Sequence, residues 1–351
     1  MSNVYFMRLL SHFIDLAKDI GGMEMTCIKT IRIQDIEGFH LGNAEYEKGG
    51  TGCTVILPEE KTLCGVDIRG GAPASRESAL LNPLAANDGV HAVLLTGGSA
   101  YGLDAAGGIM KYLEGKGIGF PVGGGTVVPI VCASSILDLG CGSSEIRPDA
   151  ELGMQACLNA EHDLYKDGCH GAGTGATCGK FYGPAAMMKS GIGSAAFQLG
   201  ELKVGAVVTV NCAGDVFDFQ TGKKIAGAYD WQKHTWISCE EAMYAAMTNI
   251  TMGANTTIGA VLTNASFNKT ELTKIAGMAH DGMARSINPV HTMYDGDSLY
   301  ALGTGRIKAD INLVGTLAAR AVSQAISNAV TSADSAYGIP SMHDIRENRS
   351  C

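Results

Sequence analysis

The feature that most constrains the fold is a predicted β-hairpin in the middle of the chain. Two apolar segments of strand length, residues 187–199 and 203–210, are separated only by Gly200-Glu201-Leu202. Such a short connection joins antiparallel neighbours, because parallel strands need a crossover of about a dozen residues or more. The sheet is therefore expected to be antiparallel or mixed, which argues against a doubly wound parallel sheet.

Strand and helix patterns run along the chain without a Pro- or Ser-rich linker or an internal repeat. Apolar, often β-branched runs predict strands, and 3.6-residue periodicity predicts helices. We therefore expect one domain, residues 25–335, with an α+β layered sandwich. The further predicted strands are 53–57, 63–68, 91–95, 127–131, 257–263 and 299–302, and the helices are 101–113, 150–162, 239–247, 269–286 and 311–330.

The two ends have a different pattern from this domain. Apolar residues between positions 4 and 20 lie on one helical stripe, which predicts an amphipathic extension over residues 1–24 that docks on the body or on a partner subunit. An upstream start codon is the alternative explanation. The tail, residues 336–351, is polar and is expected to be loose.

Composition excludes several classes of protein. The chain has 351 residues, 46% hydrophobic and 17% charged, which excludes a disordered chain, and no long uninterrupted apolar run predicts a membrane span. The net charge of −9 argues against a nucleic-acid-binding protein, which would be expected to carry a net positive charge or a basic patch. Small or neutral substrates are the expected partners, with no nucleic acid and no membrane.

The eleven cysteines are odd in number and never spaced as C-x-x-C, so neither a disulfide framework nor a zinc site is predicted. A reducing cytoplasm is the simplest location. Four N-x-S/T sequons occur, but without a secretory leader glycosylation is not expected. No metal or cofactor is predicted. The sequons begin at Asn249, Asn255, Asn264 and Asn268.

The glycine-rich loops do not fit nucleotide-binding motifs. Residues 173–180 invite comparison with a phosphate loop, but Thr174 stands where that motif needs glycine and Phe181 where it needs Ser or Thr. What remains is a glycine turn that presents Lys180. Residues 97–102 follow a strand and open a helix, yet lack G-x-G-x-x-G, so a packing turn is favoured over a cofactor site. His280-Asp281, within a predicted helix, is read as a surface or capping pair.

Thr256 stands where a polar, glycine-bearing loop passes into a predicted strand. On its own it would be an ordinary residue at a strand edge. Its significance comes from other blocks that occur in a fixed order along the chain. They are Arg69–Pro73, Leu94–Ala105, Val128–Val131, Asn211–Val216, Met278–Gly282 and Asp295–Asp297.

In that order and spacing, over about residues 25–335, the chain resembles the self-processing peptidases typified by L-aminopeptidase/D-amidase-esterase (DmpA-type), which include β-aminopeptidases and nylon-oligomer hydrolases. The resemblance implies a four-layer αββα sandwich similar to N-terminal-nucleophile hydrolases (DmpA/ornithine acetyltransferase type). It also implies autocleavage into a larger and a smaller chain, and symmetric homo-oligomers, tetrameric or higher. The junction Asn255-Thr256 resembles the nylon-oligomer (6-aminohexanoate oligomer) hydrolase branch, whereas the aminopeptidases mostly have Ser after the cut.

The chemistry of a freed Thr256 follows from its two functional groups. A threonine hydroxyl is a weak nucleophile at neutral pH and needs a base. An α-amino group, with a reference pKa of about 7.7 to 8.0, provides one on the same residue once cleavage has occurred. During cleavage that nitrogen is still an amide, so another group must act as base.

The resemblance also assigns roles to four further residues. Lys180 matches a catalytic lysine that would lower the pKa of the new amine or stabilise the hydroxyl anion, although an exposed loop lysine is the alternative. Asn211 matches an asparagine whose amide can donate to the oxyanion. Asp295 and Asp297, at i and i+2 of an extended segment, could both face the nucleophile, or could form an ordinary D-G-D turn. The aminopeptidase branch has Ser and Glu at this pair.

Arg69, Gly98 and Tyr101 are expected near the substrate mouth. The function expected is an autoproteolytic amidohydrolase that acts on small peptides or amide oligomers through an acyl-Thr256 ester. A processing-incompetent homologue with a binding or assembly role, and an acyltransferase on the same fold, are the alternatives.

Overall fold

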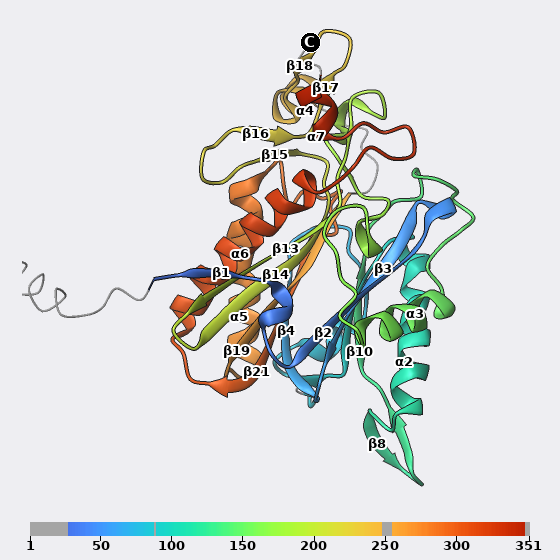
Figure 1. Cartoon of the computed structure of the whole chain (residues 1–351), viewed down its shortest axis with the longest axis vertical. Helices are drawn as coiled ribbons and strands as arrows, with labels where there is room; N and C mark the ends of the chain where they lie inside the picture. Colours follow the sequence, from blue (N-terminus) through green and yellow to red (C-terminus); the bar gives the residue numbers. More distant parts are fainter. Residues whose placement is uncertain (1–26, 88, 248–254, 348–351) are drawn as a thin grey trace, which may run out of the picture.

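The computed structural model describes residues 27–87, 89–247 and 255–347, so the predicted extension over residues 1–24 lies outside the described residues. Two β-sheets pack face to face, and a pair of helices covers the outer face of each (Figure 1). The described part of the chain is thus a four-layer αββα sandwich. No helix within it is long and apolar enough to cross a membrane.

The larger sheet has seven strands, and its middle strand is β19. Neighbouring strands are antiparallel except β19 and β21, which are parallel. The predicted hairpin is confirmed, because β13 and β14 pair in register from Ile192↔Thr209 to Leu199↔Leu202. The strand order is β1 (Lys29–Ile31), β13 (Ile192–Leu199), β14 (Leu202–Asn211), β19 (Thr256–Ala265), β21 (Ser298–Ile307), β4 (Thr62–Ile68) and β6 (Gly89–Val90).

The smaller sheet has five strands, with β7 and β10 parallel and the other neighbours antiparallel. The predicted strand 127–131 is divided here, because Pro129 has no N–H to donate to a ladder. Its first part is β9 (Thr126–Val128), which forms a separate hairpin with β8 (Phe120–Gly123). The order is β2 (Phe39–Tyr46), β3 (Thr51–Pro58), β7 (Ala92–Thr96), β10 (Val131–Ser135) and β5 (Ala74–Arg76).

Four amphipathic helices form the outer layers (Figure 1). The smaller sheet is covered by α2 (Ala105–Gly115) and α3 (Ala150–Ala160), and the larger sheet by α5 (Lys269–Ser286) and α6 (Ile311–Thr331). Side-chain caps fix where three of them start: the side chains of Asp149, Asn268 and Asp310 accept backbone N–H groups at the first turns of α3, α5 and α6. The predicted helix 101–113 begins instead as a 3₁₀ turn, Ser99–Asp104, before α2.

The core follows the two-residue period of the strands. In β19, Ile258, Ala260 and Leu262 face the smaller sheet, whereas Val261 and Ala265 pack against α5 and α6, and all five are buried. A strand that is apolar on both faces must lie inside the sandwich. Its first residue, Thr256, is buried as well.

A cap of short elements covers one end of the sandwich (Figure 1). The expectation of a loose tail after Ser335 is wrong for residues 336–345, because Ile339, Met342 and Ile345 are buried, and the last of these packs in the core of the larger sheet. The elements of this end are β11 (Thr177–Cys178), β12 (Met188–Lys189), β15 (Asp215–Phe217), β16 (Lys224–Ala226), β17 (Tyr229–Asp230), β18 (Thr235–Trp236), α4 (Cys239–Ala246), β20 (Ile287–Asn288) and α7 (Met342–Glu347).

Candidate active site

Thr256 is the first residue of β19 and is 4% exposed. It lies opposite Asn211, the last residue of β14, in the antiparallel register of the two strands. The Thr256 hydroxyl donates a hydrogen bond to the Asn255 carbonyl oxygen. The hydroxyl therefore lies directly against the carbonyl group that self-cleavage would attack.

The same carbonyl has a second donor, the backbone N–H of Gly296, at 2.9 Å. A side chain at this position would force the segment to shift, because a Cβ on Gly296 would lie 2.9 Å from both Thr256 Oγ1 and the carbonyl oxygen of Ala72. The sequence analysis missed Gly296, because it treated this residue only as the spacer between Asp295 and Asp297. Of these two donors, the Gly296 N–H can favour the negative charge that develops on this oxygen during nucleophilic attack, because the Thr256 hydroxyl must lose its proton to attack.

Lys180 reaches this strand end from the 3₁₀ turn Lys180–Tyr182. Its Nζ donates to the Asn211 side-chain oxygen at 2.6 Å and to the Asn211 carbonyl oxygen at 2.9 Å. Burial of the ammonium group lowers the pKa of Lys180 to about 8. Lys180 is thus an internally directed lysine whose pKa is lowered by burial, not an exposed loop residue.

Asn211 is fully buried and uses its side-chain amide within the protein. Its Oδ1 also accepts the backbone N–H of Thr177 at 3.1 Å, and its Nδ2 donates to the carbonyl oxygen of Leu137 at 3.0 Å. In this structure Asn211 orients Lys180, while the backbone donor to the Asn255 carbonyl oxygen is the N–H of Gly296.

The two aspartates of the D-G-D segment are both buried, but they have different partners. Asp295 Oδ2 accepts the backbone N–H and the hydroxyl of Thr292, at 2.8 and 2.6 Å. Burial, reinforced by the charge of Asp297, raises the pKa of Asp295. Asp297 Oδ1 accepts the backbone N–H of Thr257 at 2.6 Å. Asp297 therefore binds the strand residue next to Thr256, whereas the Asp295 carboxylate binds Thr292 in the loop before β21.

His291 is a second residue that the sequence analysis missed, and no sequence signal singles it out. Its backbone N–H and Nδ1 donate to Asp297 Oδ2 at 3.1 and 2.8 Å. Its ring packs edge-to-face on His280, with 4.8 Å between centroids. The reading of His280 as a surface or capping residue is wrong: it is fully buried, its Nε2 lies 3.0 Å from the Asp67 carbonyl oxygen, and burial lowers its pKa.

The three residues expected at a substrate mouth have separate surroundings. The Arg69 side chain binds Asp67 and the carbonyl oxygen of Gly277, so it points toward α5. Tyr101 is 56% exposed and packs against the guanidinium group of Arg147. Gly98 donates its N–H to Asp138 Oδ1 at 2.6 Å. Only Gly98 supports a residue of the cavity beside Asn255.

That cavity has a volume of about 420 Å³ and contains the polar groups of Asp138 and Lys180 in otherwise largely apolar walls. Burial raises the pKa of Asp138, although Thr51 and Gly98 donate hydrogen bonds to it. The residues that line it are Leu137, Asp138, Leu139, Gly140, Cys141, Gly175, Thr177, Lys180, Phe181, Gly183, Pro184, Met187, Asn255 and Ile339.

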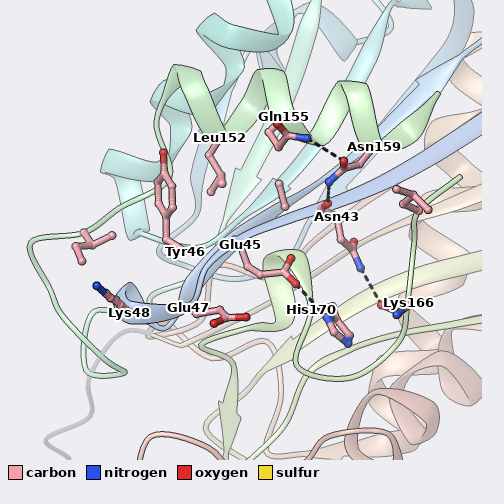
Figure 2. A pocket seen from close by; sticks show the side chains of 13 residues that line it. Asn43, Glu45, Tyr46, Glu47, Lys48, Leu152, Gln155, Asn159, Lys166 and His170 are labelled. Atoms are coloured by element: carbon pink, nitrogen blue, oxygen red, sulfur yellow. Dashed lines mark hydrogen bonds and ion pairs between the residues drawn. The ribbon is translucent and has the colours of Figure 1, made fainter. Parts of the chain in front are cut away.

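A larger hollow of about 760 Å³ lies between β2 and α3 (Figure 2). Its polar side chains bind one another: His170 pairs with Glu45 at 3.1 Å, and Asn159 donates to the Asn43 carbonyl oxygen at 2.6 Å. None of Thr256, Lys180 or Asn255 is among its lining residues. Size alone therefore does not locate the reactive site.

Comparison with known proteins was made on sequence and on structure. The family described as Peptidase family S58 matches residues 32–343. An uncharacterised aminopeptidase of Mycobacterium leprae (strain TN) is 38% identical over 341 residues, which cover 88% of this chain and 92% of the relative. A 6-aminohexanoate-oligomer endohydrolase of Kocuria sp. (strain KY2) is 33% identical over 299 residues, 83% and 79% of the two chains.

Two solved structures share the fold at low sequence identity. The L-aminopeptidase D-Ala-esterase/amidase of Ochrobactrum anthropi, described as a new variant of the Ntn hydrolase fold, matches with a TM-score of 0.67 at 16% identity, over 91% of this chain and 92% of that one. A Burkholderia sp. β-aminopeptidase matches with a TM-score of 0.64 at 18% identity, over 94% and 98%. The predicted αββα sandwich of the N-terminal-nucleophile type is confirmed. Because the family model matches most of the chain, the chain belongs to peptidase family S58 and is a hydrolase of peptide or amide bonds.

Proposed function

We propose that the chain cleaves itself between Asn255 and Thr256 and that the freed Thr256 is the nucleophile of the hydrolase. The observation that carries this proposal is the environment of the Asn255 carbonyl oxygen. It accepts hydrogen bonds from the Thr256 hydroxyl and from the Gly296 N–H. The nucleophile and an oxyanion donor thus converge on one peptide bond before any substrate binds.

Self-cleavage on this geometry has two chemical steps. Thr256 Oγ1 loses its proton and attacks the Asn255 carbonyl carbon, the C–N bond breaks, and the Thr256 nitrogen takes up a proton to become an amine. Water then hydrolyses the Asn255–Thr256 ester, which leaves a carboxylate on Asn255 and a free hydroxyl on Thr256. Lys180 is our candidate for the base of the first step, because burial lowers its pKa to about 8.

Turnover of substrate then uses the amine that cleavage has released. This amine, with a reference pKa of about 7.7 to 8.0, accepts the hydroxyl proton of the same residue. Thr256 Oγ1 attacks the substrate carbonyl, the leaving amine takes up the proton, and water releases the acyl group from Thr256. Gly296 provides the N–H donor for the oxyanion, and Asp297 holds the adjacent Thr257 in place.

We propose small peptides or short amide oligomers as substrates. The relatives are named as aminopeptidases and as a 6-aminohexanoate-oligomer endohydrolase, which supports amides of this size. The cavity beside Asn255 offers apolar walls with one carboxylate and one amino group, Asp138 and Lys180. These groups suit a compact substrate with an apolar body and a charged end.

We further propose that the protein works as a homo-oligomer. The β8–β9 hairpin projects from the sandwich (Figure 1), and Phe120, Val122 and Val128 on it are exposed. An exposed apolar group of this kind is typical of an association surface. Light scattering coupled to size-exclusion chromatography measures the mass, and a monomer at micromolar concentration would contradict this part of the proposal.

Gel electrophoresis and N-terminal sequencing test the central proposal. The wild-type chain should yield a fragment of residues 256–351 that begins Thr-Thr-Ile-Gly. The Thr256→Val variant should stay intact and inactive. Thr257→Val is the matched control, because the neighbouring Thr257 is also buried and its hydroxyl has no hydrogen-bond partner, so this variant should cleave normally. An uncut wild-type chain that hydrolyses amides at full rate would overturn the mechanism.

A further inference from the structure

The C-terminal segment supplies one wall of the cavity beside the scissile bond. Ile339 lines that cavity together with Asn255 and is only 8% exposed. It ends a tight turn, in which Ala336 and Ile339 exchange backbone hydrogen bonds of 3.2 and 2.9 Å. The two central residues, Tyr337 and Gly338, have φ of +55° and +73°. Positive φ at both positions is the signature of a type I′ turn, which reverses the chain sharply.

The turn is anchored on both sides of Ile339. The Tyr337 hydroxyl donates to the Glu47 carbonyl oxygen at 2.9 Å, and the carbonyl oxygen of Pro340 accepts the Lys189 N–H at 2.8 Å. Beyond it, the Ser341 N–H donates to Asp344 Oδ2 at 2.8 Å and to Ser335 Oγ at 2.9 Å. These hydrogen bonds therefore hold Ile339 at a fixed position in the cavity wall.

The position of Asn255 shows which part of a substrate the cavity receives. Asn255 is the acyl residue of the bond that Thr256 attacks, and it lines the cavity. An external substrate must bring its own carbonyl to the same hydroxyl, so its acyl group enters from the same side. The apolar walls around that space include Leu137, Leu139, Phe181, Pro184, Met187 and Ile339.

We propose that Ile339 determines which acyl groups the enzyme accepts, by setting the room available for an apolar side chain of intermediate size, such as that of leucine. This inference rests on the proposed function. Phe181 and Met187 lie in the segment that positions Lys180, whereas Ile339 comes from a separate segment whose hydrogen bonds described above involve neither Lys180 nor Thr256. Its bulk can therefore change without disturbing the groups assigned to the chemistry.

The test is a size series at this position: Ile339→Ala, Ile339→Val and Ile339→Phe. Each processed enzyme is assayed with the p-nitroanilides of L-alanine, L-leucine and L-phenylalanine. The measured quantity is the ratio of kcat/KM for the phenylalanyl substrate to that for the alanyl substrate. We expect Ile339→Ala to raise this ratio about tenfold and Ile339→Phe to lower it about tenfold, with Ile339→Val between Ile339→Ala and the wild type.

A ratio taken on one preparation does not depend on the fraction of chains that fold or process, so partial misfolding of a variant leaves the test intact. Ile118→Ala and Ile118→Phe are the matched controls, since Ile118 is 37% exposed and outside the cavity lining, and both should keep the wild-type ratio. Ratios that stay within twofold across the series, or an equal loss on all substrates, would overturn the inference. A wild-type chain that neither cleaves itself nor hydrolyses any anilide would instead refute the proposed function itself.

Discussion

Asp297 binds the residue that follows the proposed nucleophile, not the nucleophile itself: its Oδ1 accepts the backbone N–H of Thr257 at 2.6 Å. Its other oxygen is held by two donors from His291. The carboxylate thus links the start of β19 to the loop that precedes β21. Because Thr256 directly precedes the residue that Asp297 binds, the direction of its hydroxyl depends on Asp297, a group that need not take part in the chemistry.

Replacing Asp297 by asparagine should therefore damage both positioning and stability. In the wild type, the donors from Thr257 and His291 bind two carboxylate oxygens. The Asp297→Asn side chain offers them only one acceptor oxygen. We expect self-cleavage to slow about tenfold or more. The free energy of unfolding should fall by about 2 kcal/mol, from a lost hydrogen bond to a buried charged group. A gel time course and urea unfolding measure the two effects. Asp281→Asn, at an exposed position on α5, is the control, and equal behaviour of both variants would contradict this role.

Gly296→Ala tests the close approach of the D-G-D segment to Thr256. The added Cβ would lie 2.9 Å from Thr256 Oγ1, so the loop would have to move and carry its N–H away from the Asn255 carbonyl oxygen. Loss of one oxyanion donor costs roughly 10²-fold or more in rate. We expect self-cleavage to slow by that factor, as followed by the appearance of the 256–351 fragment.

Gly107→Ala is the matched control for Gly296→Ala. Gly107 lies inside α2, and a Cβ there would meet no atom within 4 Å. Since alanine is favoured over glycine in a helix interior, this variant should cleave normally and be more stable by about 0.5 to 1 kcal/mol. Normal cleavage by Gly296→Ala would show that its N–H is not needed.

The elements that local signals define were predictable from the sequence. The hairpin β13–β14 follows from its short connection, and the predicted helix 269–286 has the same bounds as α5, because Asn268 and Glu271 form a capping box at its start. One error arose where a local breaker interrupts an apolar pattern. Pro129 divides one predicted strand.

The candidate site was predictable only in part. The structure brings Thr256, Asn211 and Lys180 together, as the family resemblance implied, although their catalytic roles stay predictions. Gly296 and Ile339 were missed because their importance lies in close approaches between segments far apart in sequence. A residue whose effect depends on tertiary contact leaves no periodicity or motif to read.

Leu262→Ala should show how much the packing between the sheets contributes to stability. Leu262 lies fully buried in β19, in the core between the two sheets, so its truncation leaves a cavity. We expect a loss of about 2 to 5 kcal/mol in the free energy of unfolding. Leu84→Ala, at a position 94% exposed, should change it by less than about 0.5 kcal/mol. Chemical denaturation of the Thr256→Val background keeps processing out of the measurement, and similar midpoints for the two variants would place Leu262 outside the stabilising core.

The rate of self-cleavage should depend on pH through Lys180. Burial lowers its pKa to about 8, and a base acts only in its neutral form. We expect the rate to rise about tenfold per pH unit below that pKa and to level off above it. Stability changes in the same direction: the unfolded chain, with a lysine pKa of 10.5, binds more protons than the folded chain between pH 8 and 10.5. The contribution of Lys180 to the free energy of unfolding therefore rises with pH in this window.

Lys180→Arg separates the neutral base from a fixed positive charge, because an arginine stays protonated throughout this range. The variant should keep a cation at the site and lose both the self-cleavage and its pH dependence. Lys166→Arg, at an exposed lysine, is the control and should keep the wild-type profile. The measurement is the rate of fragment formation from pH 6 to 10. If Lys180→Arg cleaves at the wild-type rate, then the lysine acts through its charge, and another group must accept the proton from Thr256. Asp295 is our candidate for that group, because its pKa is raised.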